Sequence, residues 1–110
     1  MLEIAGGADP TEVACATGSS GNWYPARGEK WITGNYGNTI YNHYYPPRED
    51  RWDCMNIQQQ KAFTTARSNH RNVVNTLLCD GSVRAVQQDL GIAIWRSLAS
   101  RAGGEVVHLE

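Results

Sequence analysis

Residues 66–107 read ARSNHRNVVNTLLCDGSVRAVQQDLGIAIWRSLASRAGGEVV, and this stretch decides the fold. Two runs rich in β-branched and aliphatic residues, 72–79 and 82–87, flank the dipeptide Asp80-Gly81. This dipeptide favours positive φ at both central positions of a type I′ turn, so the stretch predicts a β-hairpin whose register is set there. The first run is apolar on both of its faces, which indicates a central strand rather than an edge strand.

A change of hydrophobic period follows the hairpin. Asp89 can cap a helix whose apolar positions recur at the 3.6-residue spacing, and Gly103 supplies the left-handed residue that ends it. Trp95 is the expected anchor of this helix against the sheet, because an indole buries more apolar area than any neighbouring side chain. Residues 105–107 read as a short closing strand.

The first half of the chain predicts a short helix and short strands. Asp9 as N-cap and Pro10 at the first helical position predict a helix that continues to about Ala16 and is ended by Thr17-Gly18. Residues 39–44 are the best strand candidate among the aromatic residues that follow, and residues 62–66 are a further one.

These elements add up to an α+β fold. We expect an antiparallel sheet of short strands with the C-terminal helix packed on it, a short N-terminal helix and long ordered loops. Residues 9–107 are expected to form a single domain. Residues 1–8 are expected to be disordered or to derive from cloning, and residues 108–110 to be the remnant of a purification tag.

Composition excludes several functional classes. Ten basic and eleven acidic residues give a net charge of -1, and no basic patch stands out, so nucleic-acid binding is not expected. No run approaches the roughly 18 apolar residues of a membrane helix. The four tryptophans and five tyrosines outnumber the single phenylalanine, a balance typical of a loop-rich domain or a surface that contacts partners.

Three cysteines allow three single pairings. Cys79 lies within the predicted central strand and suits a buried thiol. Cys15 and Cys54 lie in the less regular half, where a disulfide would contribute on the order of 3–4 kcal/mol, and we favour this pair. The pair Cys54–Cys79 is the alternative, as are three reduced thiols in a cytosolic protein. An oxidised pair would support a location in the cell envelope.

The ionisable residues offer no workable catalytic set. His70 and Asp80, with Ser68 or Ser82, have the residue types of a hydrolase triad. An intervening strand would separate the histidine and the aspartate by roughly 30 Å, so we expect no catalytic residues and no enzymatic activity.

Metal binding is not expected either. His43 and His70 have no spacing that enforces a metal site. The acidic loop of Glu49, Asp50 and Asp53 could bind calcium, but it is interrupted by arginines that would compete for the carboxylates. We therefore predict no metal and no cofactor.

The aromatic residues can be interpreted in two ways. Most should fill gaps between short strands, with Trp31 and Tyr41 in the core and with Trp23 and Trp52 partly exposed. Alternatively they form a carbohydrate-binding surface, because flat rings stack on sugar faces. The residues of that alternative surface are Trp23, Tyr24, Tyr44, Tyr45 and Trp52.

The motif of His70, nine residues and then Asp80-Gly81 resembles the prepilin-type processing-associated domain, which is named for this His-x9-Asp-Gly spacing. The tail WRSLASRAGGEVV is similar to the C-terminal signature of the same family, a planctomycete pseudopilin-like family of the DUF1559 type. Further matches lie at Gly28–Trp31, Asn42-His43, Pro46-Pro47 and Cys54, so the resemblance covers residues 15–107.

The resemblance implies a non-enzymatic head domain of a pseudopilin-like subunit, related to type II secretion and type IV pilin proteins. Such a domain is periplasmic or extracellular, and its full-length protein is anchored by an N-terminal helix expected upstream of Met1. The implied partners are other pseudopilin-like subunits or secreted cargo, with polysaccharide as the partner in the alternative reading.

Overall fold

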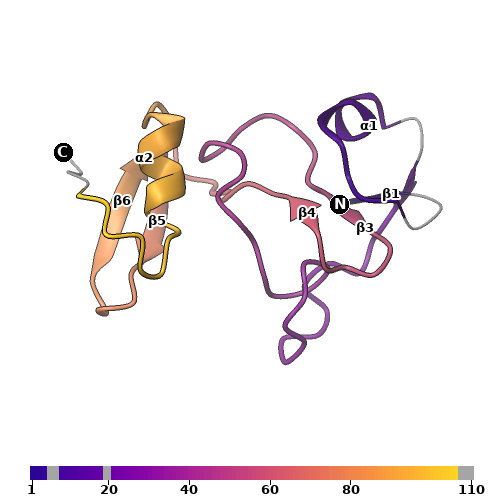
Figure 1. The fold of residues 1–110 in the computed structure, drawn as a ribbon, viewed down its shortest axis with the longest axis horizontal. Coiled ribbons are helices and arrows are strands. Elements are labelled where there is room, and N and C mark those ends of the chain that lie inside the picture. The colour runs from indigo at the N-terminus through magenta and orange to yellow at the C-terminus, as the bar shows by residue number, and fades with distance from the viewer. Residues whose placement is uncertain (5–7, 19–20, 107–110) are drawn as a thin grey trace. The chain divides into compact units, whose positions relative to one another are not determined.

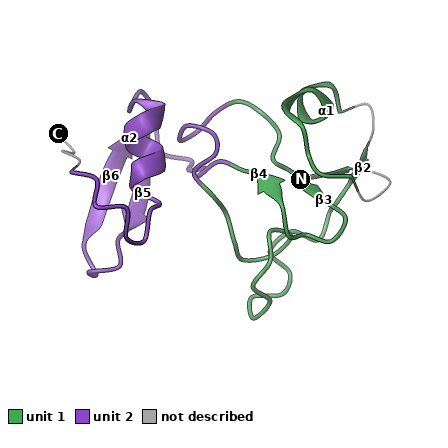
Figure 2. Cartoon of the chain, viewed as in Figure 1, with its two compact units in different colours: residues 1–42, 50–64 green, residues 43–49, 65–110 purple. Residues whose placement is uncertain are grey.

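The computed structural model describes residues 1–4, 8–18 and 21–106. The chain divides into two compact units, which are drawn in different colours in Figure 2. Unit 1 comprises residues 1–42 and 50–64, and unit 2 comprises residues 43–49 and the chain from residue 65 onwards. The range 9–107, for which the sequence predicts one domain, contributes to both units.

Unit 1 contains a sheet of four short strands (Figure 1). They are β1 (Leu2–Ile4), β2 (Gly21–Trp23), β3 (Cys54–Asn56) and β4 (Ala62–Phe63), in the order β2-β1-β3-β4. The pairing of β1 with β3 is parallel and the other two pairings are antiparallel. Strand β1 lies in the terminal segment that the sequence predicts to be disordered. Disorder, one of the two alternatives expected for this segment, does not hold at residues 2–4, because β1 has a hydrogen-bonded neighbour on each side.

The first helix is α1 (Glu12–Thr17). Its N-cap is Thr11, whose side-chain oxygen accepts a hydrogen bond from the backbone N–H three residues later. Asp9, predicted as the N-cap, instead forms an ion pair with Lys61. The helix ends as predicted at Gly18, which has the left-handed φ of 61°.

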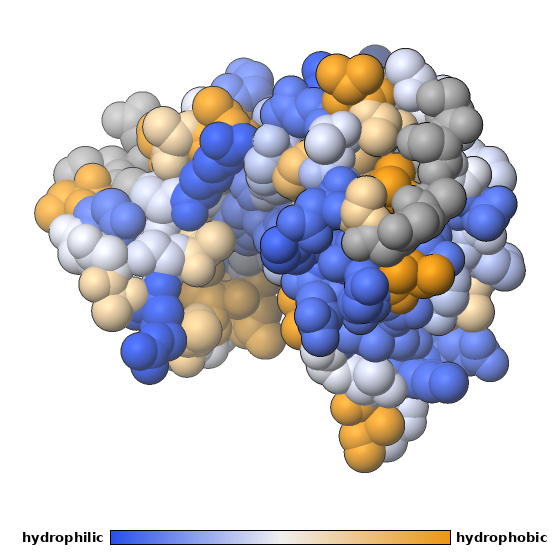
Figure 3. Space-filling view, turned by 45° about the vertical axis from the view of Figure 1, so that its right-hand side comes forward, coloured by the Kyte–Doolittle hydropathy of each residue, from blue (hydrophilic) through white to orange (hydrophobic). Residues whose placement is uncertain are grey.

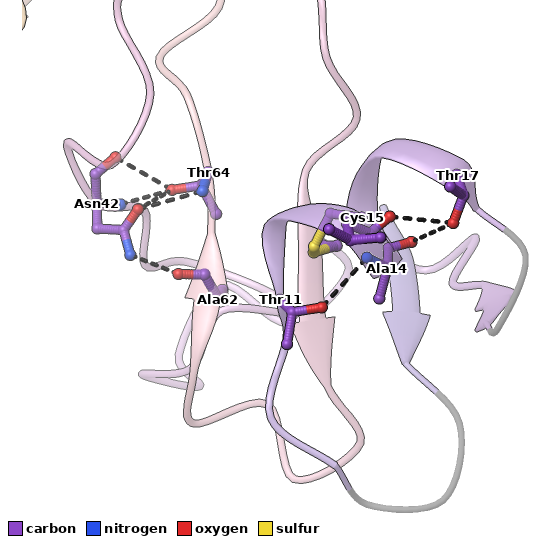
Figure 4. Close-up of a disulfide and its surroundings, with 9 residues drawn as sticks. Thr11, Ala14, Cys15, Thr17, Asn42, Ala62 and Thr64 are labelled. Atoms are coloured by element: carbon purple, nitrogen blue, oxygen red, sulfur yellow. Dashed lines mark hydrogen bonds between the residues drawn. A yellow bond between two sulfur atoms is a disulfide. The ribbon is translucent and has the colours of Figure 1, made fainter.

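The predicted strand over residues 39–44 does not form. At its centre, the backbone N–H of Asn42 donates to Thr64 Oγ1 at 2.7 Å, and its side-chain amide donates to the carbonyl of Ala62 at 2.8 Å (Figure 4). The amide oxygen of Asn42 in turn accepts from the backbone N–H of Thr64. Side-chain bonds therefore take the place of a strand ladder next to β4, of which only Ala62–Phe63 is a strand within the predicted range 62–66.

Unit 2 contains the predicted hairpin, formed by β5 (Val73–Leu77) and β6 (Val83–Gln87). The turn differs from the predicted type I′ turn: Leu78 pairs with Ser82, and of Asp80 and Gly81 only the glycine has positive φ, at 85°. This is the three-residue loop with a glycine bulge. Within the described chain β5 pairs with β6 alone, so the prediction that it is a central strand is wrong.

The C-terminal helix, α2 (Ile92–Ser97), is shorter than predicted. Its N-cap is Gly91 rather than Asp89. It ends before Gly103 because Ala99 and Ser100 donate to carbonyls three residues back, which tightens the chain out of the α-helical pattern. Residues 105–106 are not a strand, and the predictions for residues 107–110 lie outside the described residues. In the described ranges, neither helix has the length and apolar character needed to cross a bilayer.

Trp95 is the anchor of α2, as predicted, and it is fully buried. Its indole N–H donates to the carbonyl of Tyr45 at 2.8 Å. The imidazole of His43 stacks on it, with ring centroids 3.7 Å apart and an interplanar angle of 4°. Val74 and Val86, a cross-strand pair of the hairpin, are also buried in this unit, as are Tyr45 and Pro47. The sequence did not identify His43 as the stacking partner.

Candidate functional surface

The Cys15–Cys54 disulfide joins α1 to β3 (Figure 4), and this predicted pairing is confirmed. Both cysteines are buried and form an apolar cluster with Ile4 of β1, against which Ala14 and Phe63 pack. The bond closes a loop with a sequence separation of 39. A crosslink of this length removes a large share of the conformational entropy of the unfolded chain, which helps strands of only two or three residues to persist.

Trp23 and Trp52 form an exposed aromatic pair on unit 1. Their ring centroids are 5.1 Å apart and their planes meet at 75°, an edge-to-face contact. The sheet brings them together, because Trp23 and Cys54 flank Leu2 on its two sides. The side chains are 58% and 50% exposed, which confirms the prediction that both are partly exposed.

Gly18 supports the Trp52 side of this pair. A Cβ atom at Gly18 would lie 2.7 Å from the Trp52 ring, closer than side-chain atoms approach one another. The left-handed φ of this residue also favours glycine over any residue with a side chain. One glycine thus ends α1 and leaves room for the indole.

The loop of residues 30–39 is ordered by hydrogen bonds among its own residues. Asn38 accepts from the backbone N–H of Lys30 at 3.0 Å and donates to the side chain of Asn35 at 2.8 Å. The hydroxyl of Thr39 donates to the carbonyl of Thr33 at 2.5 Å. These bonds satisfy polar groups within the loop, so the loop needs no apolar core of its own.

Trp31 and Ile32 lie on this loop and are 81% and 79% exposed. The prediction that Trp31 fills the core is therefore wrong, and so is the prediction for Tyr41, which is 43% exposed. The hydrogen bonds within the loop order its backbone although the Trp31 ring is not buried. In Figure 3 the exposed hydrophobic atoms form separate patches between hydrophilic ones.

The residues of the predicted carbohydrate surface divide between the two units. Trp23, Tyr24 and Trp52 belong to unit 1, whereas Tyr44 and Tyr45 belong to unit 2. Tyr45 is only 5% exposed and cannot contribute to a binding surface.

Tyr44 belongs to a cluster around α2. The Arg96 guanidinium lies 4.9 Å from the centroid of the Tyr44 ring and donates to the Tyr44 carbonyl at 2.8 Å. Cation–π attraction and the hydrogen bond therefore hold the same residue. The edge of the neighbouring Tyr45 ring meets Tyr44 at 85°.

The motif residues His70, Asp80 and Gly81 serve turns in the described structure. The backbone N–H of His70 donates to Ser68 Oγ, and Asp80 Oδ1 accepts from the backbone N–H of Ser82 at 2.8 Å. That last hydrogen bond lowers the pKa of Asp80. His70 precedes β5 and Asp80 follows it, so the strand keeps the two apart.

Cys79 lies in the hairpin turn as an exposed free thiol. The prediction of a buried thiol within a strand is wrong, because β5 ends at Leu77 and the three-residue loop includes Cys79.

For two further groups the sequence did not identify the partners. The buried carboxylate of Asp53 forms an ion pair with Arg27, a partner that lies 26 residues away. His43 donates through Nδ1 to the Trp95 carbonyl at 2.7 Å; burial lowers the pKa of His43, and this hydrogen bond opposes the shift. Within the described ranges, no three side chains of His, Cys, Asp or Glu gather in a way that could hold a metal ion.

Comparison with known proteins places most of this chain in one family. The model of a family described as a protein of unknown function (DUF1559) matches residues 4–92, which include the whole hairpin and both cysteines of the disulfide. No curated protein and no solved structure matches the chain.

Proposed function

The chain belongs to the DUF1559 family, and from this premise we propose that it is the extracytoplasmic head domain of a pseudopilin-like subunit. The head is non-enzymatic and acts by assembly with like subunits or by contact with secreted cargo. It is periplasmic or extracellular, and an N-terminal helix outside this chain holds it at the membrane.

The buried disulfide is the observation that supports this proposal most. Cys15 and Cys54 are 3% and 0% exposed, so the bond belongs to the core and is not a surface modification. Disulfides of this kind form and persist in oxidising compartments and are rare in the cytosol. The bond therefore favours the cell envelope over the cytoplasm.

The exposed apolar side chains support a role in protein contact. Trp31 and Ile32 extend from a loop whose backbone is already ordered by hydrogen bonds. Burial of each such side chain in a partner contributes about 1.5–3 kcal/mol, and little ordering entropy opposes it. A display of this kind suits weak, repeated contacts between tethered subunits.

The location is tested with the native thiol of Cys79. A thiol reagent that does not cross membranes is applied to intact cells that express the full-length protein. We expect one modification per chain without lysis, since the other two cysteines form the disulfide. Modification only after lysis, or three reactive thiols under denaturing, non-reducing conditions, would contradict the proposal.

Assembly is tested by cross-linking the full-length protein in cells and identifying the linked partners by mass spectrometry. Links to like subunits or to secreted proteins are expected. Links to neither class, at a level of labelling that does modify the protein's own lysines, would contradict the assembly role.

A second function, polysaccharide binding, is favoured by the Trp23–Trp52 pair. A sugar ring could stack on one indole while the other indole, at 75°, flanks it. Binding to a glycan array should fall on Trp23→Ala and on Trp52→Ala. The matched control is Trp31→Ala, which removes a more exposed indole elsewhere on the unit. Equal loss in all three variants would contradict a defined site.

A further inference from the structure

We propose that a second copy of this chain docks on the outer face of the β5–β6 hairpin. This inference rests on the proposed assembly function and names the surface through which like subunits meet. Because successive side chains alternate between the two faces of a strand, the outer face consists of three cross-strand pairs. They are Val73 with Gln87, Asn75 with Ala85 and Leu77 with Val83.

The two faces of the hairpin differ in burial. On the inner face, the pair Val74 and Val86 is 6% and 3% exposed. On the outer face, the pair Leu77 and Val83 is 71% and 66% exposed. A directly opposed pair of large aliphatic side chains left in water is unfavourable by the transfer free energy of both, which a docked partner would recover.

The charge distribution selects a second copy as the partner. None of the six outer side chains is charged, and Arg84 lies on the inner face. A two-fold contact places this face against itself, so it brings no like charges together. Asn75 and Gln87 each carry an amide donor and acceptor, so either can form hydrogen bonds with an amide of the second copy. A face without a cation offers nothing to an anionic lipid or an acidic peptide.

The size of the face sets the strength of the contact. Two strands of five residues span about 17 Å by about 10 Å, well under the roughly 800 Å² that each partner buries in a stable complex. We therefore expect association only at high concentration or between subunits tethered side by side. This weakness suits a contact that is repeated along an assembly.

Sedimentation equilibrium of this chain tests the proposal up to roughly millimolar concentration, where a contact of this size should associate. Leu77→Lys places a charge in the apolar pair of each copy, where docking would remove it from water, and should weaken association at least about tenfold. The control Val13→Lys adds the same charge at a side chain 74% exposed on α1 and should have no effect. A strictly monomeric wild-type chain, or equal weakening by both variants, would overturn the proposal.

A second measurement keeps the test independent of folding defects. A spin label on the thiol of Cys79, beside the outer face in the turn, reports the distance between labels of two copies. We expect one narrow distance distribution for the wild type and for Val13→Lys, and its loss for Leu77→Lys. A broad distribution in the wild type would overturn the proposal. Cross-links to like subunits in cells that survive Leu77→Lys would leave the assembly function standing and refute only this surface.

Discussion

The two compact units keep short strands ordered by different means. Unit 1 has a disulfide at its core and side-chain hydrogen bonds that replace strand ladders, as at Asn42 and Thr64. Within the described residues, unit 2 has no disulfide; it has a hairpin of two five-residue strands and one buried indole stacked on an imidazole. Strands this short are marginal alone, so each unit needs a constraint beyond its ladder. The constraint of unit 1 depends on redox state, and that of unit 2 depends on packing and on pH.

The largest effect is expected from Trp95→Ala, which removes the constraint of unit 2. The free energy of unfolding should fall by about 3–5 kcal/mol, because the change leaves a cavity and removes the indole N–H that donates to the Tyr45 carbonyl. Hydrogen exchange should show loss of protection in β5 and β6 while β3 stays protected. Trp31→Ala is the matched control, and its effect should stay within about 0.5 kcal/mol. Equal loss of protection in both units would mean that the packing of Trp95 does not stabilise unit 2 alone.

Removal of the disulfide by the double change Cys15→Ala and Cys54→Ala should lower the stability by about 3–4 kcal/mol. The estimate follows from the loop with its sequence separation of 39. Urea denaturation measures the loss, and a reducing agent should have no further effect on the variant. Cys79→Ala, at an exposed thiol, should leave the midpoint unchanged. A wild-type midpoint that does not respond to reduction would argue against this constraint.

A smaller effect is expected at Thr64, which is fully buried. Thr64→Val keeps the shape but removes the acceptor for the backbone N–H of Asn42, so the stability should fall by about 1–3 kcal/mol. Urea denaturation of the variant beside Thr39→Val, an exposed threonine with one hydroxyl bond, checks this. A greater loss of stability in Thr39→Val than in Thr64→Val would contradict the inference that the side-chain hydrogen bonds at Asn42 stabilise unit 1.

The smallest effect is the pH dependence of unit 2. Burial lowers the pKa of His43 in the folded chain, so the unfolded chain binds the proton more readily. Stability is therefore greatest above the unfolded pKa of about 6.5 and falls as the pH drops below it toward the folded pKa. Denaturation curves across this range should show the slope for the wild type and for His70→Gln, but a reduced slope for His43→Gln. If the pH dependence of stability persisted in His43→Gln, it would have to come from another ionisable group.

Local chemistry was predictable wherever the cause lay in neighbouring residues. The hairpin over residues 72–87 and the end of α1 at Gly18 follow from turn and cap preferences. The pairing of Cys15 with Cys54 was favoured because Cys79 was assigned to a strand. Cys79 proved to be exposed in the turn, so the pairing was right although part of its reasoning was not.

The failures share a cause in contacts between distant residues. Trp31 was placed in the core because it is large and apolar, but the hydrogen bonds of Asn35, Asn38 and Thr39 order its loop without it. Tyr45, which the carbohydrate interpretation placed on the surface, is only 5% exposed, whereas Trp23 and Trp52 are 58% and 50% exposed. Amino-acid type alone does not determine which aromatic residue finds a partner.

The hairpin, the end of α1 at Gly18 and the family could be predicted from the sequence, because each depends on residues within one short window or on a fixed spacing. Tertiary structure decided which aromatic residues are buried, that β1 joins β2 to β3, and that His43 stacks on Trp95. The physical reason is the distance along the chain over which each effect acts. Turn and cap preferences act over a few bonds, whereas burial depends on which distant side chain occupies the adjoining space.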